Sequence, residues 1–119
     1  MVKKSKMDAE TLRARSEEAA KFLEMLANPR RLMILCELID GERSVGELVP
    51  IAGLQQAALS QHLARLREQG LVATRRQSQM IYYRIDDPDV VTVIQTLADI
   101  FCRPTASKSH NKLKRSAKK

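Results

Sequence analysis

Two kinds of residue in this chain could carry chemistry: its two cysteines, Cys36 and Cys102, and a group of polar side chains in segment 56–65. A cysteine thiolate is a nucleophile and a redox-active group, so the two thiols are candidates for reversible sulfur chemistry. Gln, Ser and Arg side chains hydrogen-bond to base edges and phosphates, which makes segment 56–65 a candidate nucleic-acid contact. Its candidate residues are Gln56, Ser60, Gln61 and Arg65.

The surrounding segment, 44–69, predicts how those polar side chains are positioned. Leu59, Leu63 and Leu66 recur at helical spacing, so they predict a helix with one buried stripe and a free polar face. Ser44 followed three residues later by a glutamate is typical of a capping box that begins a preceding short helix, and Gly53 is a typical end for it. Two short helices joined by a tight turn form a helix-turn-helix, in which the second is the recognition helix.

His62 lies beside the leucine stripe, so packing or a structural hydrogen bond is its main expected role, with direct DNA contact as the alternative.

Two features weaken the helix-turn-helix pattern. Pro50 lacks an N–H for the helical ladder, which favours a short or distorted helix over 45–52. Gln55 occupies the N-cap position of the recognition helix, where it is a weak cap.

A β-hairpin is predicted after the recognition helix, with strands over 72–76 and 80–85. Its tip has no glycine, so we expect a loop looser than a two-residue turn. This hairpin is the expected wing. Four of its side chains could lie along phosphates or reach a minor groove: Arg75, Arg76, Gln77 and Gln79.

The complete prediction is a mainly α fold with a small β-hairpin, a winged helix-turn-helix of five helices and a two-stranded wing. The other helices are expected over 8–27, 29–39 and 88–102. The last has an apolar face wider than one contact needs, so the first and last helices together predict a homodimer interface. Cys36 is expected on the inward face of helix 29–39, as a small hydrophobic residue.

Charge is distributed unevenly over the 119 residues, whose net charge is +7. Nine of the 21 Lys and Arg residues lie in segments 1–6 and 108–119, which contain no acid. We expect disordered basic ends over 1–7 and 104–119 around one domain, 8–103. The stronger indication of DNA binding is local, since segment 65–84 has five arginines against Glu68 alone.

Several function classes lack support in the sequence. No glycine-rich phosphate loop or nucleophile–base pair indicates an enzyme, and no cofactor is expected. With no apolar run long enough to span a bilayer and no signal peptide, we expect a cytoplasmic protein without membrane contact. In that compartment two cysteines are free thiols or a reversible pair more often than a permanent disulfide.

The segments SVGEL, ALSQHLARLREQGLV and ATRRQSQMIYYRI, within residues 15–102, resemble the DNA-binding core of the ArsR/SmtB winged-helix repressors. Within that family the chain most resembles the BigR/SqrR/HlyU branch, which senses persulfides or oxidants through two cysteines. Metal-sensing relatives carry CVC where this chain has Ser44, Val45 and Gly46, and helix 88–102 has no histidine, so no metal site is expected.

The resemblance implies a homodimeric repressor of a double-stranded DNA operator. Its two sensing positions match Cys36 and Cys102, and reactive sulfur species or oxidants would join them by a disulfide or polysulfide and release the DNA. Two alternatives stay open. One is a constitutive architectural DNA binder with structural cysteines. The other is a protein-interaction module that reuses the winged helix without DNA.

Overall fold

The computed structural model describes residues 8–102, so the predicted disordered ends lie outside the described residues. The elements follow in the order α2 (Ala9–Ala14), α3 (Ser16–Leu26), α4 (Pro29–Leu38), β1 (Arg43–Ser44), α5 (Val45–Ala52), α6 (Gln56–Glu68), β2 (Val72–Gln77), β3 (Met80–Ile85) and α7 (Pro88–Phe101). The mainly helical winged helix-turn-helix is confirmed, with six described helices in place of the five expected.

Three helices begin where their capping residues predict. The Asn28 side chain accepts hydrogen bonds from the first-turn amides of α4, and Asp87 accepts one from the first turn of α7. At α5 the capping box is complete: the Glu47 N–H donates to Ser44 Oγ at 3.2 Å, and the Ser44 N–H donates to Glu47 Oε1 at 2.8 Å. These bonds satisfy amides that a helix leaves unpaired at its start.

The predicted first helix, 8–27, is divided at Arg15, whose φ of −111° and ψ of 22° are not helical. Its guanidinium forms an ion pair with Glu18 one turn later, at 2.9 Å. No residue of α2 is buried, so α2 contributes no side chain to the core that could hold it in line with α3. The expectation of one continuous helix was therefore wrong. The apolar sequence pattern continues past Arg15, but the residues before Arg15 do not pack into the core.

The wing is an antiparallel sheet of three strands in the order β1-β3-β2, where two strands were expected. The extra strand, β1, has two residues and pairs with β3. Gln77 pairs with Met80, so only Ser78 and Gln79 form the turn, and the looser loop that we expected is wrong. Ser78 adopts φ 57° without being a glycine, a conformation that an exposed turn tolerates.

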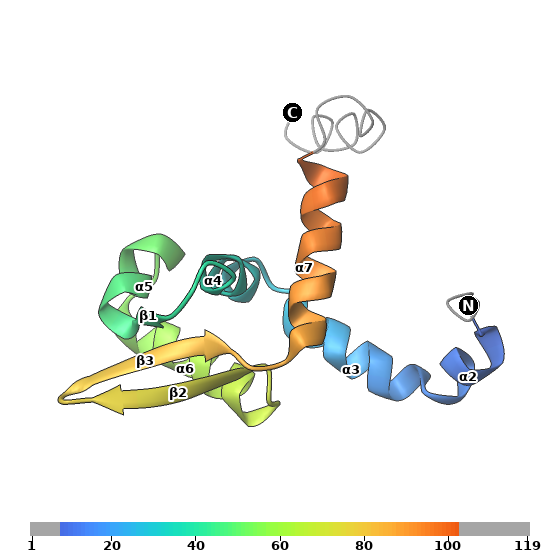
Figure 1. The fold of residues 1–119 in the computed structure, drawn as a ribbon, viewed down its shortest axis with the longest axis horizontal. Helices are drawn as coiled ribbons and strands as arrows, with labels where there is room; N and C mark the ends of the chain where they lie inside the picture. Colours follow the sequence, from blue (N-terminus) through green and yellow to red (C-terminus); the bar gives the residue numbers. More distant parts are fainter. Residues whose placement is uncertain (1–7, 103–119) are drawn as a thin grey trace.

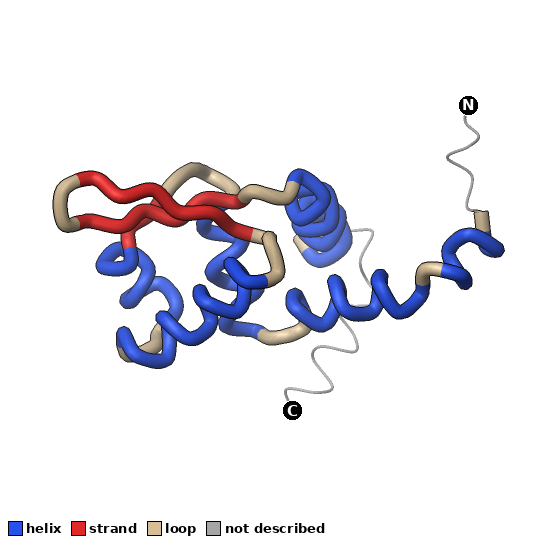
Figure 2. Tube along the Cα trace, turned by 90° about the horizontal axis from the view of Figure 1, so that it is seen from below, coloured by secondary structure: helices blue, strands red, loops and turns tan. Residues whose placement is uncertain are grey.

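The core is one cluster of buried side chains from α3, α4, α5, α6 and α7 and the start of β2. The leucines of α6 belong to it, and α6 packs against α4 and α5. Figure 1 shows the hairpin leaving this core on one side, while α3 and α2 leave it on the other and α7 stands steeply to both. Figure 2, turned by 90°, shows the hairpin lying across α5 and α6. No helix among residues 8–102 is long and apolar enough to cross a membrane.

Candidate DNA-binding surface and thiol pair

The recognition helix, α6, separates its apolar and polar faces as the leucine spacing predicts. Leu59, Leu63 and Leu66 are fully buried. The four polar candidates are all exposed: Gln56, Ser60, Gln61 and Arg65. The first two lie on the flank of the leucine stripe, and the last two lie on the side opposite to it. Three inward leucines fix the rotation of α6 about its axis, and that rotation places the polar face toward solvent, where a DNA groove could be read.

The turn before α6 has a support that the sequence patterns did not indicate. The Arg30 side chain reaches from α4 and donates its Nη1–H to the Ala52 carbonyl, 2.8 Å away, at the end of α5. Gly53 follows with φ 67°, and a Cβ at this glycine would lie 3.2 Å from Arg30 Nη1. Gln55 makes no side-chain cap to α6, as its weak capping tendency predicts. Arg30 therefore helps to hold the turn that Gln55 leaves uncapped.

His62 is half-buried on α6, between the leucine stripe and the polar face. Burial lowers the pKa of its imidazole, and the positive charges of Arg31, Arg65 and Arg30 lower it further. The neutral imidazole is therefore favoured near neutral pH. Its side chain makes no hydrogen bond to another residue within 8–102, and its role in packing or in DNA contact stays a prediction.

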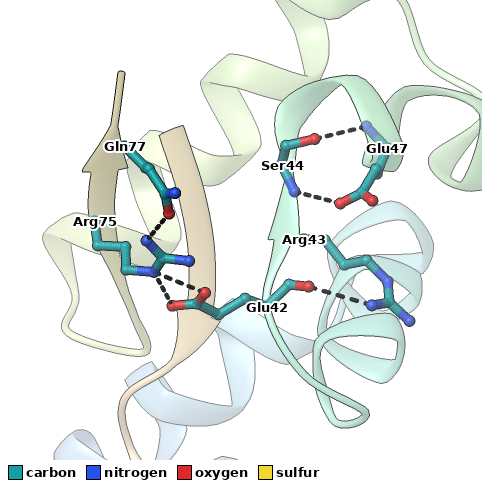
Figure 3. Close-up of polar contacts among 6 residues, drawn as sticks. All are labelled: Glu42, Arg43, Ser44, Glu47, Arg75 and Gln77. Carbon is teal, nitrogen blue, oxygen red and sulfur yellow. Dashed lines mark hydrogen bonds and ion pairs between the residues drawn. The ribbon is translucent and has the colours of Figure 1, made fainter. Parts of the chain in front are cut away.

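The wing places its two neighbouring arginines on opposite faces, because successive side chains alternate along a strand. Arg75 lies with Tyr82, its cross-strand partner, and forms an ion pair with Glu42 and a hydrogen bond to Gln77 (Figure 3). Arg76 is exposed, and its side chain makes no hydrogen bond to any described residue. Gln79 is exposed at the turn.

Cys36 is exposed, so its predicted place on the inward face of α4 is wrong. The residues that α4 turns inward are Arg31, Ile34, Leu35 and Leu38. Cys36 follows Leu35 by about 100° of helical rotation, which moves it off the buried stripe. An amphipathic stripe can be centred in more than one way, and the edge that carries Cys36 was counted as core.

Cys102 ends α7 and is also exposed. Its N–H donates to the Ala98 carbonyl at 2.8 Å, which makes it the C-cap of the helix. Both thiols are free. The structure thus puts one thiol on α4 and one at the end of α7, on two helices that pack against each other.

The pKa of the Cys36 thiol is raised above its ordinary value. Partial desolvation is the main cause, although the residue retains solvent contact. The negative charge of a Cys102 thiolate and that of Glu37 raise the pKa further. Cys102 therefore lies close enough to Cys36 to raise its pKa, although the two residues are 66 positions apart in the chain.

Apolar side chains remain uncovered on α2, α3 and α7. Leu12, Leu23 and Phe101 expose 50%, 55% and 44% of their surface. A groove between the α2–α3 arm and α7 has Phe22 and Val93 in its lining. In the part of the chain that is described, no three His, Cys, Asp or Glu residues gather as metal ligands would.

Comparison with known proteins assigns the sequence to a family. Residues 28–74 match the profile of the bacterial regulatory proteins of the arsR family. The chain is 42% identical over 102 residues to the transcriptional activator HlyU of Vibrio cholerae, covering 86% of this chain and 94% of that protein. It is 43% identical over 96 residues to the biofilm growth-associated repressor of Xylella fastidiosa, covering 81% and 84%.

Solved structures agree with the sequence matches. The transcriptional repressor BigR of Xylella fastidiosa superimposes with a TM-score of 0.77 at 43% identity, covering 81% of this chain and 98% of that one. Reduced HlyU of Vibrio cholerae gives a TM-score of 0.73 at 44% identity, covering 79% and 99%. The matched regions include the helix-turn-helix whose polar face is described above. The chain belongs to the ArsR family of DNA-binding transcriptional regulators.

Proposed function

We propose that this regulator is a homodimeric repressor that leaves its operator when Cys36 and Cys102 become covalently linked by reactive sulfur species or oxidants. The observation that carries the proposal is the pair of free, exposed thiols on the packed helices α4 and α7. The charge of a Cys102 thiolate also contributes to the raised pKa of Cys36, which supports their proximity. The relatives add support, because one is a biofilm growth-associated repressor and another has been solved as reduced HlyU.

The DNA contacts follow from the exposed faces of α6 and the wing. Gln56, Ser60 and Gln61 would meet base edges or phosphates in a major groove, and Arg65 would meet a phosphate. His62 sits at the edge of this face. Wing side chains would add backbone or minor-groove contacts. The wing candidates are Arg75, Arg76, Gln77 and Gln79.

A dimer is supported by the apolar surface that a single chain leaves open. Leu12, Leu23 and Phe101 lie on the α2–α3 arm and on α7, away from the core. Exposed apolar side chains gathered on two long elements favour an interface. In a two-fold dimer built on this surface, two α6 helices would enter successive major grooves about one helical turn apart. A near-palindromic operator is the matching DNA.

The chemistry balances without a cofactor. In a plain disulfide the two thiols lose two protons and two electrons, and the oxidant accepts the electrons. With an organic tetrasulfide, two Cys–SH groups displace two thiol molecules and keep the two internal sulfur atoms, giving a four-sulfur bridge. Either product ties the end of α7 to α4. We expect the link to change DNA affinity by a coupling of about 1–3 kcal/mol, or about 5- to 150-fold.

The test is operator binding with and without a sulfur donor. The reduced protein first selects a duplex from a random pool, and fluorescence anisotropy then measures its affinity before and after treatment with an organic tetrasulfide. We expect wild type to release the duplex and Cys36→Ser and Cys102→Ser to keep it. Mass spectrometry of the released protein should contain a linked peptide pair. Retained binding by treated wild type would instead indicate a constitutive DNA binder, and release by both serine variants would place the chemistry elsewhere.

A further inference from the structure

The wing residue Arg75 contacts three neighbours at once, of which Figure 3 shows Glu42 and Gln77. Its Nε–H donates to both carboxylate oxygens of Glu42, at 2.8 and 2.9 Å, and its Nη1–H donates to Gln77 Oε1 at 2.7 Å. The guanidinium carbon also lies 4.8 Å from the centre of the Tyr82 ring, a cation–π distance. Long side chains on a surface usually sample many rotamers, whereas this one is fixed on two edges and one face.

The carboxylate that holds Arg75 comes from a segment that is itself fixed. Glu42 lies between α4 and β1, and the next residue, Arg43, forms an ion pair with Glu37 of α4 at 3.1 Å. Arg43 Nη1 also donates to the Glu42 carbonyl at 3.2 Å. Ser44 then enters β1 and caps α5. The Glu42 side chain therefore extends from a base that is bonded to both α4 and the helix-turn-helix.

This ion pair crosses the sheet. β3 lies between β1 and β2 in the strand order, so a side chain that begins just before β1 reaches over β3 to meet Arg75 on the edge strand. The turn end of the hairpin projects away from the core (Figure 1). A contact from its edge strand to the α4–β1 segment restricts how far it can rotate about its root.

The neighbouring residues Arg75 and Arg76 differ in whether their charge is paired. Arg75 has a carboxylate on its Nε edge, which neutralises its charge locally. Arg76 has no ion pair within residues 8–102 and lies on the other face of the strand. An arginine that binds a phosphate adds most to DNA affinity when its positive charge is unpaired and can replace a condensed counterion. An arginine already neutralised by a carboxylate adds less.

We infer that Arg75, with Glu42, is a positioning residue that fixes the angle of the wing to the recognition helix, and that Arg76 is the wing's phosphate ligand. This inference refines the DNA surface of the proposed function and rests on it. Arg75 acts on DNA through the placement of the hairpin, so it should affect wing order in the free protein. Arg76 should affect only the bound state.

The test compares Arg75→Gln with Arg76→Gln, which remove the same charge from adjacent residues of one strand. Two quantities are measured on the full chain: amide hydrogen exchange of β2 and β3 without DNA, and the slope of log affinity against log salt on the selected duplex. Glu42→Gln is added to the exchange measurement, with Asp40→Asn as its control, because Asp40 is an exposed acid of the same segment. The charge swap Glu42→Arg with Arg75→Glu tests rescue.

We expect Arg75→Gln and Glu42→Gln to speed exchange of the wing amides about two- to fivefold, the effect of losing a surface ion pair, with the swap recovering most of it. Asp40→Asn and Arg76→Gln should leave exchange unchanged. The salt slope should fall by about 0.9 for each wing in Arg76→Gln and by less than half of that in Arg75→Gln. Equal slope losses in both arginine variants, or unchanged wing exchange in Arg75→Gln and Glu42→Gln, would overturn the inference. If wild type bound no duplex, the proposed function would fail, and the exchange data would still decide the role of Arg75.

Discussion

The substitution Gln55→Ser should stabilise the protein, because α6 begins without a side-chain cap. Gln55 already has the extended backbone of an N-cap residue, with φ −72° and ψ 157°, but its side chain accepts no hydrogen bond from the first turn. Ser44 shows what a serine does in the same geometry, with φ −80° and ψ 164°, where its Oγ accepts from the Glu47 N–H at 3.2 Å. A good N-cap contributes about 1 kcal/mol relative to a side chain that does not cap.

Urea unfolding at fixed protein concentration measures this gain. With a slope of about 1–3 kcal/mol per molar urea, 1 kcal/mol moves the midpoint upward by about 0.3–1 M at unchanged slope. Gln56→Ser is the matched control, since the first helical residue cannot cap its own helix, and it should leave the midpoint unchanged or slightly lower. The reasoning is refuted if Gln55→Ser leaves the midpoint where it is, or if both variants move it upward together.

Three further predictions concern the core and the titratable groups. Leu63→Ala removes a fully buried side chain of α6 and should lower the unfolding free energy by about 3–5 kcal/mol in denaturant titration, whereas a loss under 1 kcal/mol would contradict its place in the core. Cys102→Ser removes the thiolate whose negative charge raises the pKa of Cys36, so Cys36 should be alkylated faster when the rate is followed over a pH series. An unchanged alkylation rate would show that the two thiols do not interact. The pKa of His62 is lowered on folding, so the unfolded chain binds the proton more readily and acidification from about pH 7.5 to about pH 5.5 should destabilise wild type more than His62→Gln; equal losses in urea titrations would count against this.

The elements with their own start and stop signals could be predicted from the sequence. Asn28, Ser44 and Asp87 cap α4, α5 and α7 as their types indicate, and the leucine spacing predicts which face of α6 is buried. These features are local, because a cap bonds to amides two or three residues away. Gly53 at the end of α5 is equally local, with the positive φ that glycine tolerates.

The errors arise where distant contacts decide. Cys36 was expected in the core because helical spacing alone does not say where a stripe is centred, and the elements that pack on α4 determine that. The break at Arg15 follows from the absence of packing on α2, which no local pattern reports. Likewise, the Glu42–Arg75 pair joins residues 33 positions apart, and Arg30 reaches Ala52 over 22, so neither contact had a signal in the sequence.

The two cysteine-bearing helices are held very unequally. Among the elements of residues 8–102, α4 packs against α3, α5, α6, α7 and β3, whereas α7 has substantial contacts with α4 and β3 alone. A covalent link between α4 and the end of α7 would therefore move α7, which is the less restrained of the two helices, and leave α4 in place. Because α7 also carries exposed apolar surface, its displacement would reach any second chain seated there before it altered the helix-turn-helix itself. In the proposed dimer, the spacing between the two helix-turn-helix units would change, while each unit kept its own shape.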